Sequence, residues 1–412
     1  MKALPFPCIR PVPEHAAEVA ALPYDVFDRA EAAAYVAGHP LSFLNIDRPE
    51  TQFDPEHDMY APEVYARGAE LLRERIEDGT FVEDKNLAYY IYQLAWEAAS
   101  KPASHAFAPS TITSRAHQTP RAHARRQGAR SYRAHRGPRL PNWAHLPHLP
   151  RPARAGHDRG RRQNLTPLYD FTDEAGVRQT VWEVARRDAV DALHAMLGQI
   201  PCAYIADGHH RAASAVKVAQ RMREQAKAEG MYTGKEPFNY FLSVLFPASQ
   251  LTILPYNRVV ADRNGLDTHE LLEALIGTGF GIIEATGPVE PSERGVFGMF
   301  TDGTWYELHG DMRDAVSAVA SLDVSILQDH ILAPILGIDD PRTDPRISFV
   351  GGIRGTDELE ARAGKNGIAF TLCATGIDQL LTIADAGEVM PPKSTWFEPK
   401  LRSGLFIHRI AK

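Results

Sequence analysis

The chain has 412 residues, more than one compact core usually holds, so two lobes or domains are expected. Hydrophobic residues make up 44% and charged residues 24%, as in soluble globular proteins, and the formal net charge is −7. The sequence contains no apolar run of about 18 residues, so no membrane span is predicted. The N-terminus lacks the apolar stretch of a signal peptide. The three cysteines, Cys8, Cys202 and Cys373, do not have the spacing of a zinc site or of a disulfide framework. A cytoplasmic protein without a membrane partner is therefore expected.

Residues 1–99 are expected to form the N-terminal α/β part of the core. Apolar residues recur at helical spacing from Pro62 to Ile76, and Asp78-Gly79 follows them, which predicts a helix that ends there. The run from Leu87 to Leu94 (LAYYIYQL) is rich in aromatic and β-branched residues and predicts a buried strand.

Residues 100–163 have a different composition. They hold 13 Arg, one Lys and one Asp, a net charge of +13, so the rest of the chain carries −20. They show no apolar period, so no packed element is expected there. A basic, disordered insertion that contacts nucleic acid or only solvent is one interpretation. A stretch of gene read in the wrong frame is the interpretation that the composition favours.

The genetic code allows the second interpretation. One legal codon choice for Thr119 to His135, read one base later, encodes RHEHTRADKEQDRIEH, which is typical of an amphipathic helix start. Asn142 to Pro150 can encode TGPIFLTY, typical of a strand, in the same shifted phase. The nucleotide sequence across codons 95–165 tests this hypothesis, because codons incompatible with these peptides would end it.

Residues 164–259 are expected to complete the core. The predicted elements are a hairpin of Leu168 to Phe171 and Thr180 to Val184, a helix from Ala189 to Leu197, a strand from Cys202 to Ala206 (CAYIA), a long helix from Ala212 to Lys227 and a strand from Tyr240 to Phe246. Residues 260–412 are expected to form a C-terminal α/β lobe. Its predicted elements are a helix from His269 to Ile276, a strand from Gly281 to Glu284, helices near 313–336 and a closing strand near 405–410.

The junction Asp207-Gly208-His209-His210-Arg211 is the strongest local motif. Gly208 allows a tight turn, and the free N–H groups of the helix that follows favour an anion. His209 and Arg211 add charge-assisted donors that suit phosphate. Asp207, at a strand end, is expected to hold Mg²⁺ or to orient a hydroxyl. The structural alternative is an N-cap Asp with surface His and Arg side chains.

Two further groups are weaker candidates. The segment MPPKSTWFEPK holds two lysines, Lys393 and Lys400, with Ser394 and Thr395 among prolines. These residues could bracket a phosphate or carboxylate, although a fixed surface loop explains them equally well. Tyr256, Asn257 and Arg258 follow a buried strand and are candidates for lining a substrate cleft. The Gly351 to Gly355 segment (GGIRG) is more simply a turn.

With these motifs in hand, the chain resembles a bacterial family known as domain of unknown function ten-fifteen. The matching pieces are PYDV at 23–26, YYIYQL at 89–94, PLYDF at 167–171, ADGHHR at 206–211, NYFLSVLFPASQLTILPYNR at 239–258, FVGGIRG at 349–355 and MPPKSTWFEPKLRSGL at 390–405. The IADGHHRAASA segment is similar to the phosphate-binding motif of the ParB/sulfiredoxin-like superfamily, in its SerK-like free serine kinase branch. Sulfiredoxins have Cys where this chain has His209, so their chemistry is not implied.

The resemblance implies a mixed α/β (α+β) fold with a ParB/sulfiredoxin-like core. It implies a small-molecule kinase that uses Mg²⁺ and ADP or ATP to phosphorylate a hydroxyl amino acid such as free serine. Asp207 and His210 would be catalytic, and Gly208, His209 and Arg211 would bind phosphate. The family's upstream His-Glu, which carries the base, has no counterpart in the printed residues and returns only in the shifted reading.

Two alternatives remain open. One is a ParB-like protein that binds nucleotide, or associates with nucleic acid, without phosphorylating a metabolite. The other is a frameshifted product without activity. Nucleic acid is the less expected partner, because the basic charge lies almost wholly in residues 100–163.

Overall fold

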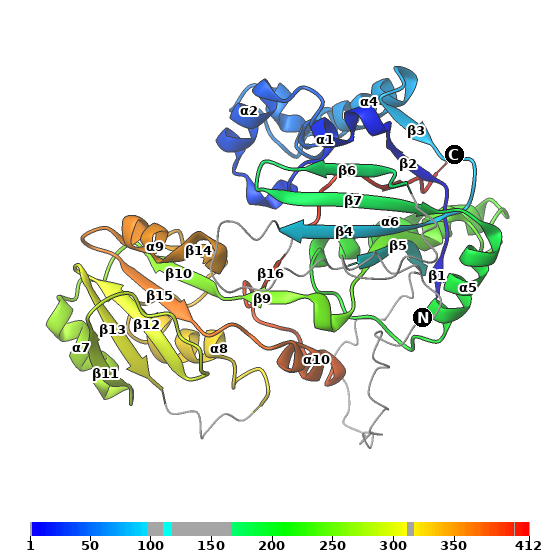
Figure 1. Cartoon of the computed structure of the whole chain (residues 1–412). Helices are drawn as coiled ribbons and strands as arrows, with labels where there is room; N and C mark the ends of the chain where they lie inside the picture. The colour runs from blue at the N-terminus through cyan, green and yellow to red at the C-terminus, as the bar shows by residue number, and fades with distance from the viewer. Residues whose placement is uncertain (1, 97–109, 118–165, 311–316, 399, 412) are drawn as a thin grey trace, which may run out of the picture. The chain divides into compact units, whose positions relative to one another are not determined.

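The computed structural model describes residues 2–96, 110–117, 166–310, 317–398 and 400–411. The chain forms two compact units (Figure 1), Met1–Gln250 with Lys400–Lys412 as the first and Leu251–Pro399 as the second. Each unit combines helices with antiparallel sheet, so the mixed α/β class expected from the sequence is confirmed. Residues 400–412 pack with the first unit.

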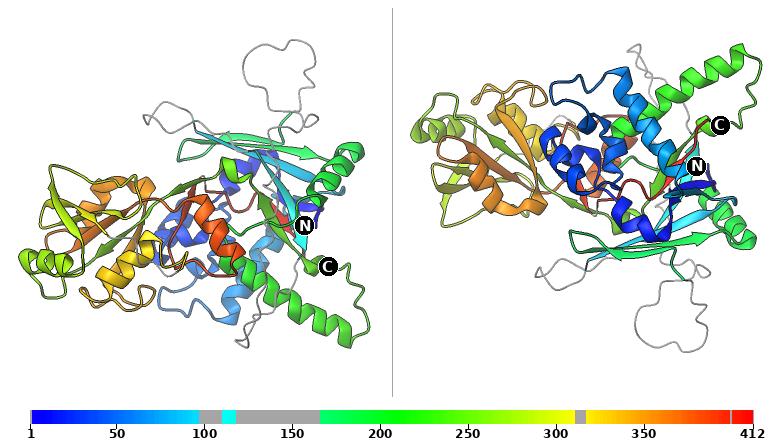
Figure 2. Two further views of the ribbon diagram at one scale, coloured as in Figure 1. Left: turned by 90° about the horizontal axis from the view of Figure 1, so that it is seen from below. Right: turned by 90° about the horizontal axis from the view of Figure 1, so that it is seen from above.

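The first unit holds both long predicted helices and the predicted hairpin. Its helices are α1 (Ala16–Val19), α2 (Arg29–Gly38), α3 (Leu44–Asp47), α4 (Pro62–Glu77), α5 (Arg187–Gly198) and α6 (His209–Ala228). Its strands are β1 (Ala3–Leu4), β2 (Cys8–Pro11), β3 (Phe81–Glu83), β4 (Tyr89–Trp96), β5 (Ser110–His117), β6 (Tyr169–Thr172), β7 (Val177–Val184), β8 (Tyr240–Leu245) and β17 (Ile407–His408). Figure 2 shows α6 in green in two further views.

The main sheet of the first unit has the strand order β1-β5-β4-β7-β6, with β8 also paired to β5. Successive side chains of β4 point to opposite faces, as the pleat requires. Tyr90 and Tyr92 are buried in one core together with Phe406, whereas Tyr89 packs with Leu193 of α5 on the other face. The aromatic run that predicted this strand therefore contributes to two of the buried clusters of the unit.

Strand β5 corrects one expectation. Residues 110–117 lie within the Arg-rich segment, for which no packed element was expected, yet they pair with β4, β8 and β1. Backbone hydrogen bonds can pair a strand with its neighbours even when its sequence has no apolar periodicity. Thr111, Ile112 and Thr113 are also β-branched residues, which favour strands. Residues 97–109 and 118–165 lie outside the described chain.

The strand expected from Cys202 to Ala206 is a second correction. These residues have no regular secondary structure, and three of the five are exposed, among them Ile205 at 47%. A short apolar run forms a strand only when the edge of another strand is available for pairing. The length and composition of the run do not show whether such an edge exists. Asp207 thus follows an irregular, largely exposed segment and not the end of a core strand.

The second unit is a six-stranded antiparallel sheet with helices on both faces. Its strands, in the order β11-β13-β12-β15-β10-β14, are β10 (Tyr256–Val260), β11 (Gly281–Ala285), β12 (Val296–Thr301), β13 (Thr304–His309), β14 (Ile347–Gly351) and β15 (Ile368–Leu372). A separate pair joins β9 (Thr252–Leu254) to β16 (Trp396–Glu398). Its helices are α7 (Thr268–Gly277), α8 (Asp323–Leu327), α9 (Gly355–Ala363) and α10 (Ile377–Asp385).

The central strand β15 is buried on both faces, which the sequence pattern IAFTL allows. Phe370 faces a core that includes Leu271 of α7 and Leu327 of α8, whereas Ala369 faces Leu359 of α9. The predicted helix at His269 to Ile276 and the strand at Gly281 to Glu284 are confirmed. Of the helices expected near 313–336, α8 and a π-helical turn at Gln328–Leu332 are described, and residues 311–316 lie outside the described chain.

The end of the chain is fixed to the first unit by a buried ion pair. Nη2 of Arg402 lies 2.6 Å from Oδ2 of Asp173, and both side chains are less than a tenth exposed. Asp173 also accepts hydrogen bonds in the turn between β6 and β7.

Among the described helices, none has the length and apolar character needed to cross a bilayer.

We expect Asp323 to make the second unit more stable in mild acid than at neutral pH. Burial raises the pKa of this carboxyl to about 6, although the Gly295 N–H and Arg294 lower it in part. Its Oδ2 has no hydrogen-bond partner among the residues that the structure describes. The folded state therefore holds a proton that the unfolded state, with a pKa of 3.8, has released. The free energy of unfolding should fall between about pH 4 and pH 6, by up to about 3 kcal/mol.

Asp323→Asn removes this charge, so it should flatten that pH dependence and raise the free energy of unfolding at pH 8. Urea denaturation at pH 4.5 and pH 8 measures both effects. The matched control is Asp302→Asn, at an exposed turn position with a positive φ that Asn adopts readily; it should change stability by less than about 0.5 kcal/mol. An unchanged pH profile in Asp323→Asn would contradict the assignment.

Candidate functional site

The N-terminus of α6 is suited to bind an anion. Gly208 precedes the helix with φ 79°, in the left-handed region that glycine adopts at little cost. A Cβ atom at this position would lie 3.4 Å from Nε of Arg211, so glycine leaves the guanidinium room beside the helix start. The first turn contains no acidic residue, and its N-cap residue, Gly208, has no side chain with which to cap it. Its N–H groups and the positive end of the helix dipole therefore favour a negatively charged ligand.

Asp207 carries the one carboxylate of this motif. Its Oδ1 accepts a hydrogen bond of 2.7 Å from the Gly208 N–H, and its Oδ2 lies 3.2 Å from Nζ of Lys400. The Asp207 side chain is 48% exposed and that of Lys400 19%. Two residues 193 positions apart in the sequence thus form an ion pair at the start of α6.

The surrounding charges determine the ionisation of Asp207. Partial burial acts to raise the pKa of this carboxyl, but the Lys400 ammonium, the Gly208 N–H and the Arg211 guanidinium together hold the pKa below its ordinary value. The carboxyl is therefore ionised at neutral pH. A carboxylate with a lowered pKa is a weak proton acceptor, since general bases work best when their pKa lies near the operating pH. The geometry favours Asp207 as a group that orients a ligand or contacts a cation.

His209 and His210 begin α6, but their side chains lie outside the described part of the structure. The expected phosphate contact of His209 and the catalytic role of His210 remain predictions. Arg211 is exposed on the first turn of the helix.

Tyr256, Arg258 and Lys393 are brought together in the second unit. Lys393 Nζ lies 3.1 Å from the Tyr256 hydroxyl and 5.2 Å from the centre of its ring. Arg258 donates a 3.1 Å hydrogen bond from Nη2 to the Lys393 carbonyl. Two of the weaker sequence motifs therefore form a single cluster.

The remaining candidates have structural contacts. Buried Asn257 accepts a hydrogen bond through Oδ1 from the Leu372 N–H, between β10 and β15. The Ser394 hydroxyl donates to the Pro391 carbonyl at 2.6 Å, and Ser394 is buried. Thr395 is partly buried beside it. For Asn257 and Ser394 these contacts explain the residue without a ligand.

Lys400 is the second lysine of a motif that the sequence offered as an anion site, but the sequence did not predict its contact with Asp207. It lies in the same MPPKSTWFEPK motif as Lys393, but the two lysines belong to different units. The sequence signal was a second lysine just after Pro399, where the motif leaves the strand Trp396–Glu398. Only the tertiary structure shows that Lys400, and not Lys393, contacts Asp207.

The donor set at α6 fits a polyphosphate better than a resident metal. Arg211, Lys400 and the helix N-terminus are cationic or donate hydrogen bonds, whereas Asp207 offers a single carboxylate. Across the residues that the structure describes, no group of three or more His, Cys, Asp or Glu side chains could hold a metal ion. Mg²⁺ commonly binds through one or two carboxylates together with substrate phosphates, so Asp207 fits a Mg²⁺ that arrives with a nucleotide.

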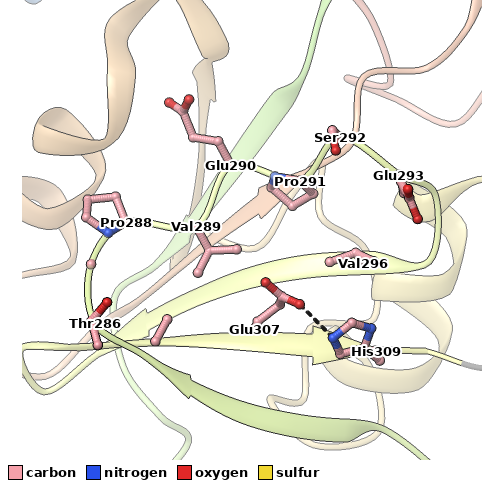
Figure 3. A pocket seen from close by; sticks show the side chains of 12 residues that line it. Thr286, Pro288, Val289, Glu290, Pro291, Ser292, Glu293, Val296, Glu307 and His309 are labelled. Atoms are coloured by element: carbon pink, nitrogen blue, oxygen red, sulfur yellow. Dashed lines mark ion pairs between the residues drawn. The ribbon is translucent and has the colours of Figure 1, made fainter.

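The second unit has a cavity of about 520 Å³ whose lining includes none of the predicted site residues. Figure 3 shows the side chains that line it. Glu290, Glu293, Glu307 and His309 are among its lining residues, and His309 pairs with Glu307 at 2.7 Å. The excess of carboxylates disfavours a phosphate ligand by charge repulsion. This cavity is therefore a poor candidate for the phosphate site.

The chain matches a known protein family. The family described as Protein of unknown function (DUF1015) matches residues 3–107 and 153–325, most of the chain. The chain belongs to this family. The DUF1015 match contains the Asp207 to Arg211 motif, and the residues it omits between its two parts, 108–152, lie within the Arg-rich segment.

Solved structures show more distant similarity. One is a free serine kinase mutant in complex with AMP, with 18% identity, a TM-score of 0.28, and 50% of this chain and 73% of that chain covered. Another is a conserved hypothetical protein from Pyrococcus furiosus, with 16% identity, a TM-score of 0.28, and 55% and 89% covered. No curated protein matches the DUF1015 chain.

We expect Lys400→Gln to raise the pKa of Asp207, because the substitution removes the ammonium group that stabilises the carboxylate. A ¹³C NMR titration of the Asp207 carboxyl measures the shift. Lys217→Gln, at an exposed position two turns further along α6, is the control and should leave the pKa unchanged. An Asp207 pKa that is the same in Lys400→Gln and in the unmodified protein would show that the ion pair does not form in solution.

Proposed function

We propose that this protein binds a nucleoside di- or triphosphate at the N-terminus of α6, and that its function is phosphoryl transfer to a small hydroxyl metabolite such as free serine. The observation that carries the proposal is the convergence of Lys400 and Arg211 on Asp207 at a helix start whose N-cap residue is glycine. Two cations, free N–H groups and the helix dipole together match the charge of a polyphosphate.

Each residue has a chemical task in this proposal. Arg211 and Lys400 neutralise phosphate oxygens, and Gly208 lets the backbone approach the ligand closely. Mg²⁺ bound to the nucleotide would neutralise further charge on the transferring group. Asp207, ionised and partly exposed, would contact that cation or accept a hydrogen bond from the substrate hydroxyl. Phosphoryl transfer depends mainly on such positioning and charge neutralisation.

The proton acceptor of the transfer lies outside the Asp207 carboxylate in this proposal. The lowered pKa of Asp207 makes it a poor base, and His210 stays a prediction. The family match omits residues 108–152, where the shifted reading restores a His-Glu pair. This coincidence supports the proposal that a frameshift removed the base from this copy. The chain would then bind nucleotide but transfer phosphate slowly, since loss of a general base lowers rates by about 10²–10⁴-fold.

A second function has the same binding geometry. A ParB-like protein would use the α6 site to bind nucleotide without phosphorylating a metabolite, and the low pKa of Asp207 favours this alternative. The products distinguish the two. Phosphoserine formed from serine and nucleotide by the frame-restored protein supports the kinase, whereas nucleotide hydrolysis without phosphoserine supports the alternative.

We expect Arg211→Ala to weaken ADP binding by about tenfold or more, because a charge-assisted contact to phosphate is lost. Isothermal titration calorimetry with Mg²⁺ present measures the dissociation constant. Arg221→Ala is the matched control, because it removes the same charge from an exposed position on the same helix. Equal effects of the two substitutions would mean that general charge, such as that of the Arg-rich segment, binds the nucleotide. That result would contradict the proposed site.

A further inference from the structure

Three segments that are far apart in sequence meet at the start of β10. Tyr256 pairs in register with Gly351 of β14, and Trp396 lies against the same place. A Cβ atom on Gly351 would approach the Trp396 ring to 2.6 Å, so only glycine allows this packing. Tyr256 makes edge-to-face contacts with Trp396 at 5.2 Å and with Phe349 at 6.0 Å. Its ring, and therefore its hydroxyl, is held in a fixed position.

Lys393 is held above this ring in an unusual backbone conformation. Its φ is 54°, which is rare for a residue with a side chain and costs about 1 kcal/mol or more. The Arg258 guanidinium bonds the Lys393 carbonyl at 3.1 Å, which helps to fix this conformation. The exposed ammonium then lies 3.1 Å from the Tyr256 hydroxyl. Two groups able to donate hydrogen bonds to an anion thus lie side by side.

Arg258 adds a buried positive charge at the same place. It is 4% exposed, and its hydrogen bonds go to the carbonyls of Tyr256 and Lys393. Its guanidinium lies 5.4 Å from the centre of the Phe349 ring. Within the described chain no carboxylate pairs with it, and burial lowers its pKa to about 10. A buried charge without a counterion is unfavourable, and an anion bound nearby would reduce that penalty.

We infer that Lys393, Tyr256 and Arg258 form a binding site for a small anion, the carboxylate or phosphate group of a metabolite. The Lys393 ammonium and the Tyr256 hydroxyl touch the anion. Arg258 is a positioning residue, which fixes the Lys393 backbone and contributes charge from inside the protein. The site lies wholly in the second unit and does not depend on the function proposed for α6.

The site is tested by titrating inorganic phosphate, and separately acetate, into the full-length protein by calorimetry. The titrations use an Arg211→Ala background, in which the α6 site is weakened, and every variant is compared with that background. Lys393→Gln and Tyr256→Phe should each weaken binding about tenfold. Lys365→Gln, which removes the same charge from an exposed position in the same unit, should not. The tighter-binding probe identifies the ligand group as phosphate or carboxylate.

Arg258 is tested by a pair of variants. Arg258→Lys keeps the positive charge and should retain binding within about threefold, whereas Arg258→Gln should lose about tenfold in affinity. A merely structural role would make the two variants similar in affinity once both are shown to be folded. If Lys393→Gln and Tyr256→Phe bind both probes as tightly as Lys365→Gln does, the site does not exist. That result would leave the nucleotide site at α6 untouched.

Discussion

The ion pair between Asp207 and Lys400 is the interaction on which the functional account depends. It joins the start of α6 to the segment with which the chain returns from the second unit to the first. Without Lys400, the Asp207 carboxylate would oppose an anion at the helix N-terminus. With Lys400 and Arg211 present, the local charge becomes positive. The same lysine also lowers the pKa of Asp207, so this carboxyl is ionised at neutral pH.

The two lysines of a single sequence motif thus belong to two separate clusters of side chains. In MPPKSTWFEPK, Lys393 lies beside Tyr256 and Arg258 in the second unit, whereas Lys400 belongs to the first. Neighbouring residues of the motif have packing roles, as the buried Ser394 shows. Polar residues in a proline-rich loop are therefore not equivalent, because the fold of the loop determines which of them meet other charges.

The sequence predicted elements whose signals are local. Helical spacing located α4 and α6, and an aromatic run located β4, because an amphipathic helix or a buried strand is determined by its own side chains. It failed for residues 202–206 and for β5, where the decisive factor is whether a neighbouring strand edge is available. It identified Asp207 and Arg211, and it placed Lys400 in a separate candidate motif, but it did not pair Lys400 with Asp207, since no periodic pattern links residues 193 positions apart. It also grouped Asn257 and Ser394 with the site, although both have structural hydrogen bonds.

The central claim is that the α6 N-terminus holds a polyphosphate. A crystal structure of the protein with bound ADP tests it most directly. The account predicts the diphosphate at the first turn of α6, with Arg211 and Lys400 bonding its oxygens and the distance between Lys400 and Asp207 longer than 3.2 Å. A diphosphate bound at any other place, with the Asp207–Lys400 pair intact, would contradict the account.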